Sequence, residues 1–250
     1  MMRRIDMDLQ TLWQSFLDIV YPTDIRCLIC NAKREEMSGY GICKICESHL
    51  PFIEPPVCTK CGKMMIEESL CLDCQQSDHA FYRGISIFEF NAEVRRLIHR
   101  YKYKQEKYLS TPMIHWMSEG LKVYKWEFDL IVPVPLHPIR ERKRGFNQAD
   151  LLARGLSKST GVPLVNQGLL RIKNTPQQAK LSKEQRQRNL RDAFIISERA
   201  KSLKTFHNKT ILLVDDVYTT GSTANQCASE LLAGGADRVY VITLATGSNF

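Results

Sequence analysis

Eight of the nine cysteines lie between positions 27 and 74, as four CxxC pairs. The pairs are Cys27 and Cys30, Cys43 and Cys46, Cys58 and Cys61, and Cys71 and Cys74. A two-residue gap lets a tight turn aim both thiolates at one ion, and four thiolates complete a tetrahedral Zn²⁺ site. Disulfides and redox motifs are the alternatives, but strict pairing without a signal peptide favours metal. The spacing therefore predicts two zinc ions.

The even spacing suggests a duplicated zinc ribbon, with the first four cysteines around one ion and the last four around the other. An interleaved cross-brace of the same pairs is the alternative. Gly62 follows Cys61 directly and relieves crowding where the chain turns beneath the metal. Because this region has few aliphatic residues, we expect the metal to supply much of its folding free energy.

A second reactive group follows the aliphatic run 211–214, which predicts a buried central strand. Asp215 and Asp216 come where that predicted strand ends, which is the side of an α/β sheet where ligands bind. A turn of small residues then leads into a predicted helix over 224–232; it contains Thr219, Thr220, Gly221, Ser222 and Thr223. Backbone N–H groups at a helix start bind phosphate, while acids beside them suit hydroxyl groups or a cation. A sugar phosphate with neighbouring hydroxyls fits both halves.

The sequence argues against two other phosphate-related sites. A Walker A loop needs GxxxxGK[ST], and this sequence does not contain it. A phospho-acceptor receiver domain also places two aspartates after a strand. It would need most of a doubly wound fold after them, and only residues 217–250 remain.

Alternating strand and helix patterns after about residue 79 predict the framework that positions these acids. The predicted strands cover residues 85–90, 130–135, 162–165, 193–196, 211–214 and 239–244. Helices are predicted over 94–101, over 149–156 before Gly161, and over 224–232 before Gly234. Strands separated by helices indicate an α/β fold with a mostly parallel sheet covered on both faces. Cys227 lies on an apolar helix face, which predicts a core residue.

Composition and charge indicate two modules. With 44% apolar and 25% charged residues, the chain is an ordinary globular protein. Its net charge of +8 is unevenly placed, because residues 1–78 are net negative and residues 79–250 net positive. We predict a domain over 1–78, a helix plus a double zinc ribbon, and a ligand-binding domain over 79–250. The basic domain is the one expected to meet an anionic partner.

The first 20 residues bear on location. Acidic and amide residues interrupt what would be a signal-peptide core, and no run of 18 apolar residues occurs, so we expect a cytoplasmic protein. Apolar positions over 8–20 have helical spacing. Peripheral membrane association is the alternative, but the polar face lacks a Lys/Arg cluster, which favours packing on protein.

The segment 211–224 resembles the motif that binds phosphoribosyl pyrophosphate (PRPP) in type I phosphoribosyltransferases. The resemblance implies that Asp215 and Asp216 hold the ribose 2′- and 3′-hydroxyls, and that residues 219–223 hold the 5′-phosphate. The strand end at Pro133, Val134 and Pro135 resembles the pyrophosphate loop. Family members use Mg²⁺ on the pyrophosphate and displace it at C1 of the ribose.

Two basic stretches extend the resemblance to nearly the whole chain. The first, 140–148, contains Arg144 within the string RGFNQ; the second, 171–191, contains the pattern TxxQxxL…RxxN. Both patterns, together with the paired cysteines, resemble ComF-type (ComFC) competence proteins. A solvated surface loop is the alternative for each stretch.

The ComF-type resemblance implies a role in natural competence, handling imported single-stranded DNA beside a competence helicase. The interleaved aromatics and lysines of 101–108 suit such contacts, although Tyr101 in the core with lysines in water fits equally. A metabolic phosphoribosyltransferase acting on a nucleobase or amine, or a non-catalytic scaffold, are the alternatives. The sequence contains no readable acceptor motif, so catalytic residues and enzymatic activity stay open.

Overall fold

The computed structural model describes residues 26–33, 36–175 and 192–247 of the 250-residue chain. Its contacts divide the chain into two compact units, Met1–Leu50 and Pro51–Phe250. This division falls earlier than the sequence-based boundary after residue 78, because the second cysteine group shares a core cluster with the sheet. The predicted helix over 8–20 and most of the second basic stretch lie outside the described residues.

The described residues of the smaller unit form turns and one short helix, α2 (Lys44–Ser48). Cys43 caps this helix, since its sulfur accepts a hydrogen bond from the Cys46 amide. An isolated antiparallel bridge joins Met37 to Cys43. So little regular structure leaves the metal as the main source of order for this unit.

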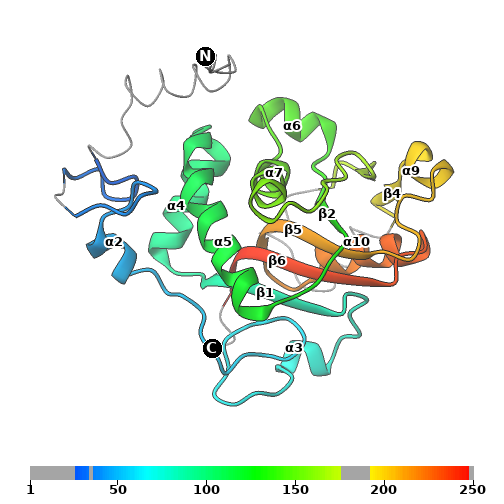
Figure 1. Ribbon diagram of the computed structural model, residues 1–250, viewed down its shortest axis with the longest axis horizontal. Helices are drawn as coiled ribbons and strands as arrows, with labels where there is room; N and C mark the ends of the chain where they lie inside the picture. The colour runs from blue at the N-terminus through cyan, green and yellow to red at the C-terminus, as the bar shows by residue number, and fades with distance from the viewer. Residues whose placement is uncertain (1–25, 34–35, 176–191, 248–250) are drawn as a thin grey trace, which may run out of the picture. The chain divides into compact units, whose positions relative to one another are not determined.

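The larger unit contains a four-stranded sheet in which every neighbouring pair is parallel. The strand order is β1 (Arg83–Glu89), β6 (Arg238–Thr246), β5 (Thr210–Tyr218) and β2 (Leu130–Pro133). Figure 1 shows the sheet at the centre of this unit. The predicted parallel α/β fold is thereby confirmed, and β5 is an interior strand as expected.

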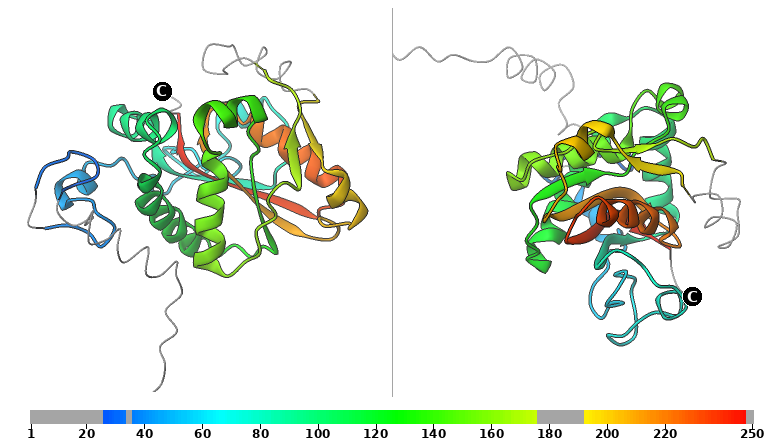
Figure 2. Two further views of the ribbon diagram at one scale, coloured as in Figure 1. Left: turned by 90° about the horizontal axis from the view of Figure 1, so that it is seen from above. Right: turned by 90° about the vertical axis from the view of Figure 1, so that its right-hand side faces the viewer.

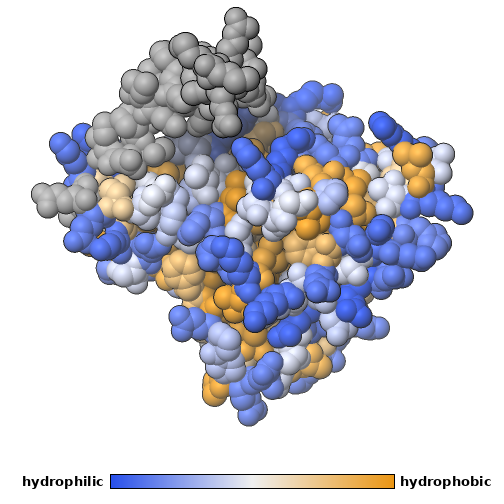
Figure 3. Space-filling model, viewed as in Figure 1, coloured by the Kyte–Doolittle hydropathy of each residue, from blue (hydrophilic) through white to orange (hydrophobic). Residues whose placement is uncertain are grey.

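Helices cover both faces of the sheet (Figures 1 and 2). One face carries α4 (Ala92–Tyr103), α5 (Ser110–Tyr124) and α7 (Gln148–Thr160); the other carries α10 (Ser222–Ala233). Shorter pieces complete the unit: α3 (Leu72–Gln75), η1 (Lys107–Leu109), α6 (Pro138–Arg144) and α9 (Glu198–Ser202). Hydrophilic side chains cover much of the face drawn in Figure 3, with patches of hydrophobic residues between them. Within the described residues, no helix has the length and apolar character needed to span a membrane.

The side chains of β5 point alternately to the two faces of the sheet and are buried on both. Ile211 and Leu213 belong to a buried cluster that includes Cys227 of α10, as predicted for that cysteine. Leu212 and Val214 are fully buried as well, and the pleat directs them to the opposite face. The central strand is therefore covered on both sides, which explains its continuous apolar run.

One predicted strand is confirmed outside the parallel sheet, and one was wrong. Residues 193–196 contribute β4 (Phe194–Ile196), which pairs antiparallel with β3 (Leu169–Arg171) in a separate two-stranded sheet. Residues 162–165 make only an isolated bridge, between Leu164 and Ile131. Short apolar runs do not reveal which strand they will pair with, because that choice is made by tertiary packing.

Candidate functional site

The two acids lie inside β5 rather than after it. The ladder with β6 continues through Asp215, paired with Thr243, to Tyr218, paired with Thr246. The sequence-based end of this strand was therefore too early. Because successive strand residues point to opposite faces, Asp215 and Asp216 face different layers at the carboxyl end of the sheet.

Asp216 pairs with a lysine for which the sequence suggested either nucleic-acid contact or exposure to solvent. Lys102 Nζ of α4 lies 2.8 Å from Asp216 Oδ1, and these side chains are only 18% and 12% exposed. Tyr101 beside it is fully buried and donates a hydrogen bond to the Gln148 carbonyl, so the core placement of Tyr101 is confirmed. Lys102 adjoins the buried face of α4, and this position was the sequence signal that its long side chain could reach a partly buried partner.

Asp215 lies on the other face of the strand. Its Oδ1 accepts a hydrogen bond from the Asp216 amide at 2.8 Å. Burial and the neighbouring Asp216 charge raise the pKa of Asp215 to about 7, although Lys102 and Arg171 act in the opposite direction. A carboxyl group poised near neutrality can donate or accept a hydrogen bond, which suits recognition of a hydroxyl group.

The turn after β5 has little free space beneath it. Gly221 has φ +75°, and a Cβ there would lie 2.3 Å from the Tyr218 hydroxyl. The hydroxyls of Thr220 and Ser222 are 2.9 Å apart. Ser222 begins the 12-residue helix α10, whose start has no side-chain cap, so its first N–H groups remain for a ligand. Through the helix dipole and these N–H donors, such an arrangement can bind a phosphate group.

The proposed pyrophosphate loop lies next to the acids. Pro133 pairs with Val214 across the β2–β5 ladder, and the Val134 amide donates to the Val214 carbonyl at 2.9 Å. Asn147 Nδ2 holds the Val134 carbonyl at 3.1 Å. A pocket of about 420 Å³ opens beside the loop, with Pro133, Pro135 and Arg171 in its lining.

Three arginine side chains near this pocket donate hydrogen bonds to uncharged groups. Arg140 donates to the Thr175 carbonyl, Arg171 to the Thr175 hydroxyl, and Arg144 to the Gln148 side-chain oxygen. Burial lowers the pKa of Arg171, and the charge of Arg140 lowers it further. Among the described residues, the hydrogen-bond partners of these partly buried cations are neutral oxygens, and such cations favour an anionic ligand.

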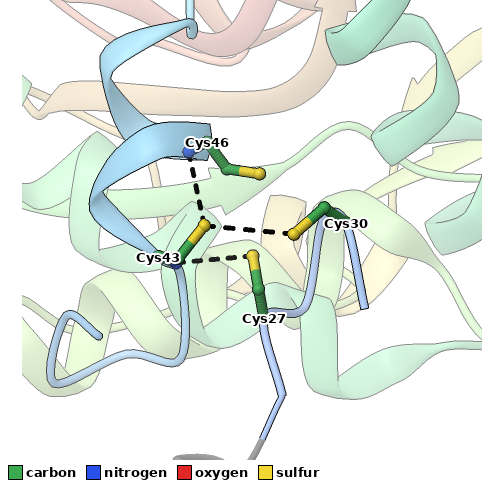
Figure 4. A group of neighbouring side chains, drawn as sticks. All are labelled: Cys27, Cys30, Cys43 and Cys46. Carbon is green, nitrogen blue, oxygen red and sulfur yellow. Dashed lines mark hydrogen bonds between the residues drawn. The ribbon is translucent and has the colours of Figure 1, made fainter. Parts of the chain in front are cut away.

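The cysteines form two groups of four in sequential order. In each group the sulfur atoms lie within 4.8 Å of one another, and the groups are Cys27, Cys30, Cys43 and Cys46, and Cys58, Cys61, Cys71 and Cys74. The first group is drawn in Figure 4. Its Cys30 and Cys43 sulfurs are 3.9 Å apart, and those of Cys61 and Cys71 in the second are 3.7 Å apart. A tetrahedral ZnS₄ site with bonds of about 2.3 Å requires roughly 3.8 Å, so both groups fit zinc.

Backbone amides point at these sulfurs, as a thiolate requires. The Cys43 amide donates to Cys27 Sγ at 3.4 Å, and the Cys71 amide to Cys58 Sγ at 3.3 Å. Burial acts to raise the pKa of Cys27, but hydrogen bonds from the backbone amides of Cys43, Cys30 and Ile29 outweigh it and lower the pKa to about 7. The chain thus carries two four-cysteine zinc-binding sites in the predicted pairing, and the interleaved alternative does not occur.

Known proteins resemble the chain in both parts. The model of the double zinc ribbon domain matches residues 16–75. Competence protein F of Haemophilus influenzae is 29% identical over 228 residues, which cover 89% of this chain and 97% of that protein. Competence protein ComFC of Bacillus subtilis is 29% identical over 201 residues, covering 78% of this chain and 79% of the other.

Solved structures give more distant matches. Glutamine PRPP amidotransferase from Bacillus subtilis is 18% identical, with a TM-score of 0.39 over 58% of this chain and 30% of its own. A purine phosphoribosyltransferase from Pyrococcus horikoshii is 21% identical, with a TM-score of 0.32 over 54% of this chain and 70% of its own.

DNA utilization protein YhgH of Salmonella typhimurium is 31% identical over 225 residues. The alignment covers 86% of this chain and 94% of that protein. The chain therefore belongs to the family of competence protein F and DNA utilization protein YhgH, the ComF-type proteins.

Proposed function

We propose that the chain binds PRPP at the carboxyl end of β5 and acts in the handling of single-stranded DNA during competence. The observation that carries the first half is the sequence of a diacid, a glycine turn and an uncapped helix start on one interior strand. Asp215 and Asp216 take the ribose hydroxyls, and the turn 219–223 takes the 5′-phosphate.

The opposite end of the ligand meets the β2 loop. Pro133, Val134 and Pro135 place their backbone beside the acids, and the arginine cluster of Arg140, Arg144 and Arg171 supplies positive charge. A pyrophosphate carrying Mg²⁺ would find there both amides and cations. Lys102 keeps a cation beside Asp216, which offsets the repulsion between the acids and an anionic ligand.

Calorimetry with PRPP and Mg²⁺ tests this binding. The wild-type chain should bind, whereas the double variant Asp215→Asn/Asp216→Asn should bind about tenfold more weakly or worse. Glu119→Gln is the control, because this exposed carboxylate pairs with Lys122 on the outside of α5. Equal affinity in all three proteins would remove the proposal. Ribose 5-phosphate as a second probe reports the diacid and turn without the pyrophosphate.

Binding does not by itself require transfer. Pyrophosphate release from PRPP, followed with a panel of nucleobases and amines, separates a transferase from a scaffold. Release that depends on one acceptor and on Asp215 would establish an enzyme; a bound but intact PRPP throughout the panel would favour the scaffold. The ligand-binding proposal survives either result, because the calorimetric test is independent.

The second half rests on exposed basic and aromatic residues of the segment 103–108 and of α6, which are Tyr103, Lys104, Lys107, Tyr108, Arg142 and Lys143. Tyr103 and Tyr108 are each 50% exposed. The Arg144 guanidinium lies 5.1 Å from the Tyr103 ring centroid, and the His99 ring lies 4.9 Å from the same ring. Exposed rings between cations are the usual means of binding single strands.

The ComF-type membership supports the cellular setting, which is the cytoplasmic side of DNA uptake beside the competence helicase. Co-purification of tagged chain with that helicase from competent cells tests the partnership. If the chain binds oligonucleotides but never co-purifies with the helicase, the DNA-binding proposal stands and the helicase partnership is refuted.

A further inference from the structure

The second cysteine group lies in the same unit as the phosphate-binding turn, unlike the first. Cys58, Cys61, Cys71 and Cys74 belong to the buried cluster that also contains Tyr218 and Ala224. Tyr218 ends β5, and Ala224 lies in the first turn of α10. The cluster therefore runs from the metal site to the residues on both sides of Gly221.

Two side chains form the floor of the turn. The Tyr218 hydroxyl and the His79 Cε1 would lie 2.3 Å and 3.0 Å from a Cβ at Gly221. His79 stacks on Phe81 with ring centroids 4.9 Å apart, and Phe81 meets Tyr218 edge-on at 6.2 Å.

The ribbon is also fastened to the elements around the turn. A Cβ at Gly62 would lie 2.5 Å from the Gly84 carbonyl, so the metal-binding turn presses directly on β1. The Gly84 amide donates to the Lys60 carbonyl at 2.7 Å. Beyond the last cysteine, the Ala80 amide donates to Asn225 Oδ1 of α10 at 2.5 Å.

We propose that Tyr218 is a positioning residue through which the second zinc site holds the phosphate-binding turn in its binding conformation. This inference rests on the proposed function. Metal at the second group then raises the affinity for the 5′-phosphate, and by linkage a bound phosphate raises the affinity for that metal. We expect this higher affinity to appear as slower release of the metal. The first group, in a separate compact unit, has no such coupling.

Zinc release to a chromogenic chelator measures the coupling without any catalytic readout. In full-length Cys30→Ser/Cys46→Ser the remaining zinc is at the second group, and PRPP with Mg²⁺ should slow its release about tenfold. In Cys71→Ser/Cys74→Ser the remaining zinc is at the first group, and PRPP should leave its release rate unchanged. Equal retardation of both zincs, or of neither, would overturn the inference.

Tyr218→Phe is the decisive variant, because the cysteine variant of the second group alters a buried cluster. It keeps the ring against Phe81 and removes only the hydroxyl beneath Gly221. We expect two bound zincs, PRPP affinity lowered about fivefold, and retardation of zinc release reduced by the same factor. Wild-type affinity and full retardation in this variant would refute the role of Tyr218. A wild-type chain that binds no PRPP would instead refute the proposed function.

Discussion

Lys102 Nζ and Asp216 Oδ1 form a 2.8 Å ion pair that joins α4 to the carboxyl end of β5. Both side chains are mostly withdrawn from solvent, so each charge depends on the other for compensation. The pair therefore fixes the position of one acid of the candidate ribose site.

Lys102→Met should lower the free energy of unfolding by about 3 kcal/mol, because it leaves the Asp216 carboxylate buried without its cation. Lys102→Met/Asp216→Asn should recover most of this loss. Urea denaturation of the wild type, both single variants and the double variant gives the coupling energy. Additive single effects would show that the two groups do not interact.

Asp215 predicts a pH dependence of stability. Its pKa is raised from 3.8 to about 7 in the folded chain, so the folded state holds the proton more tightly than the unfolded one. The contribution of Asp215 to the free energy of unfolding is fully present below about pH 4 and falls as the pH rises toward 7. Asp215→Asn lacks this loss, so its advantage over wild type should grow across that window, by on the order of 2–4 kcal/mol. A constant difference between pH 4 and 8 would contradict the raised pKa.

Gly221→Ala should disable the turn. The substituted residue would need φ +75° and a methyl group 2.3 Å from the Tyr218 hydroxyl. We expect a loss of about 2 kcal/mol in stability and of PRPP binding altogether. Gly39→Ala is the matched control, since a Cβ there meets nothing within 4 Å. Normal PRPP affinity in Gly221→Ala would show that the turn does not hold the phosphate.

Metal analysis should find two zinc ions per chain. Substituting two cysteines of either group should remove one ion and leave the other, because the groups are separate. Mass spectrometry under native conditions counts the ions directly. One shared ion, or disulfides in protein prepared under reducing conditions, would contradict this assignment.

Single-strand binding should depend steeply on salt. Arg142→Gln/Lys143→Gln removes two cations of α6, and the slope of log affinity against log salt should fall by about 1.4. Tyr103→Ala should cost about 1–3 kcal/mol while leaving the salt slope intact, since it removes stacking and no charge. Fluorescence anisotropy with an oligothymidylate measures both. A salt-independent affinity would exclude an electrostatic surface.

Local patterns predicted much of this fold. The four aliphatic residues before Asp215 indicated an interior strand, and Gly161 correctly ended α7. The CxxC spacing predicted the metal groups because ligand geometry is set within a few residues. The pairing of groups in sequential order agrees with the simplest interpretation.

Other features depended on contacts that sequence spacing does not encode. The ion pair of Lys102 with Asp216 joins residues far apart in the chain, and the helical spacing left only nucleic-acid contact or solvent as predictions for this lysine. The antiparallel pairing of β3 with β4 was likewise fixed by tertiary packing. The grouping of Tyr218 with the second cysteine group needed the three-dimensional cluster as well.

Neighbouring aspartates on one strand address opposite sides of the sheet, with Lys102 of α4 on one side and α10 on the other. A single pentose that binds both carboxylates would connect the two faces of the sheet. Helices on opposite faces of the sheet would then gain protection from hydrogen exchange together, and a ligand that binds one acid alone would protect only the helices on that side.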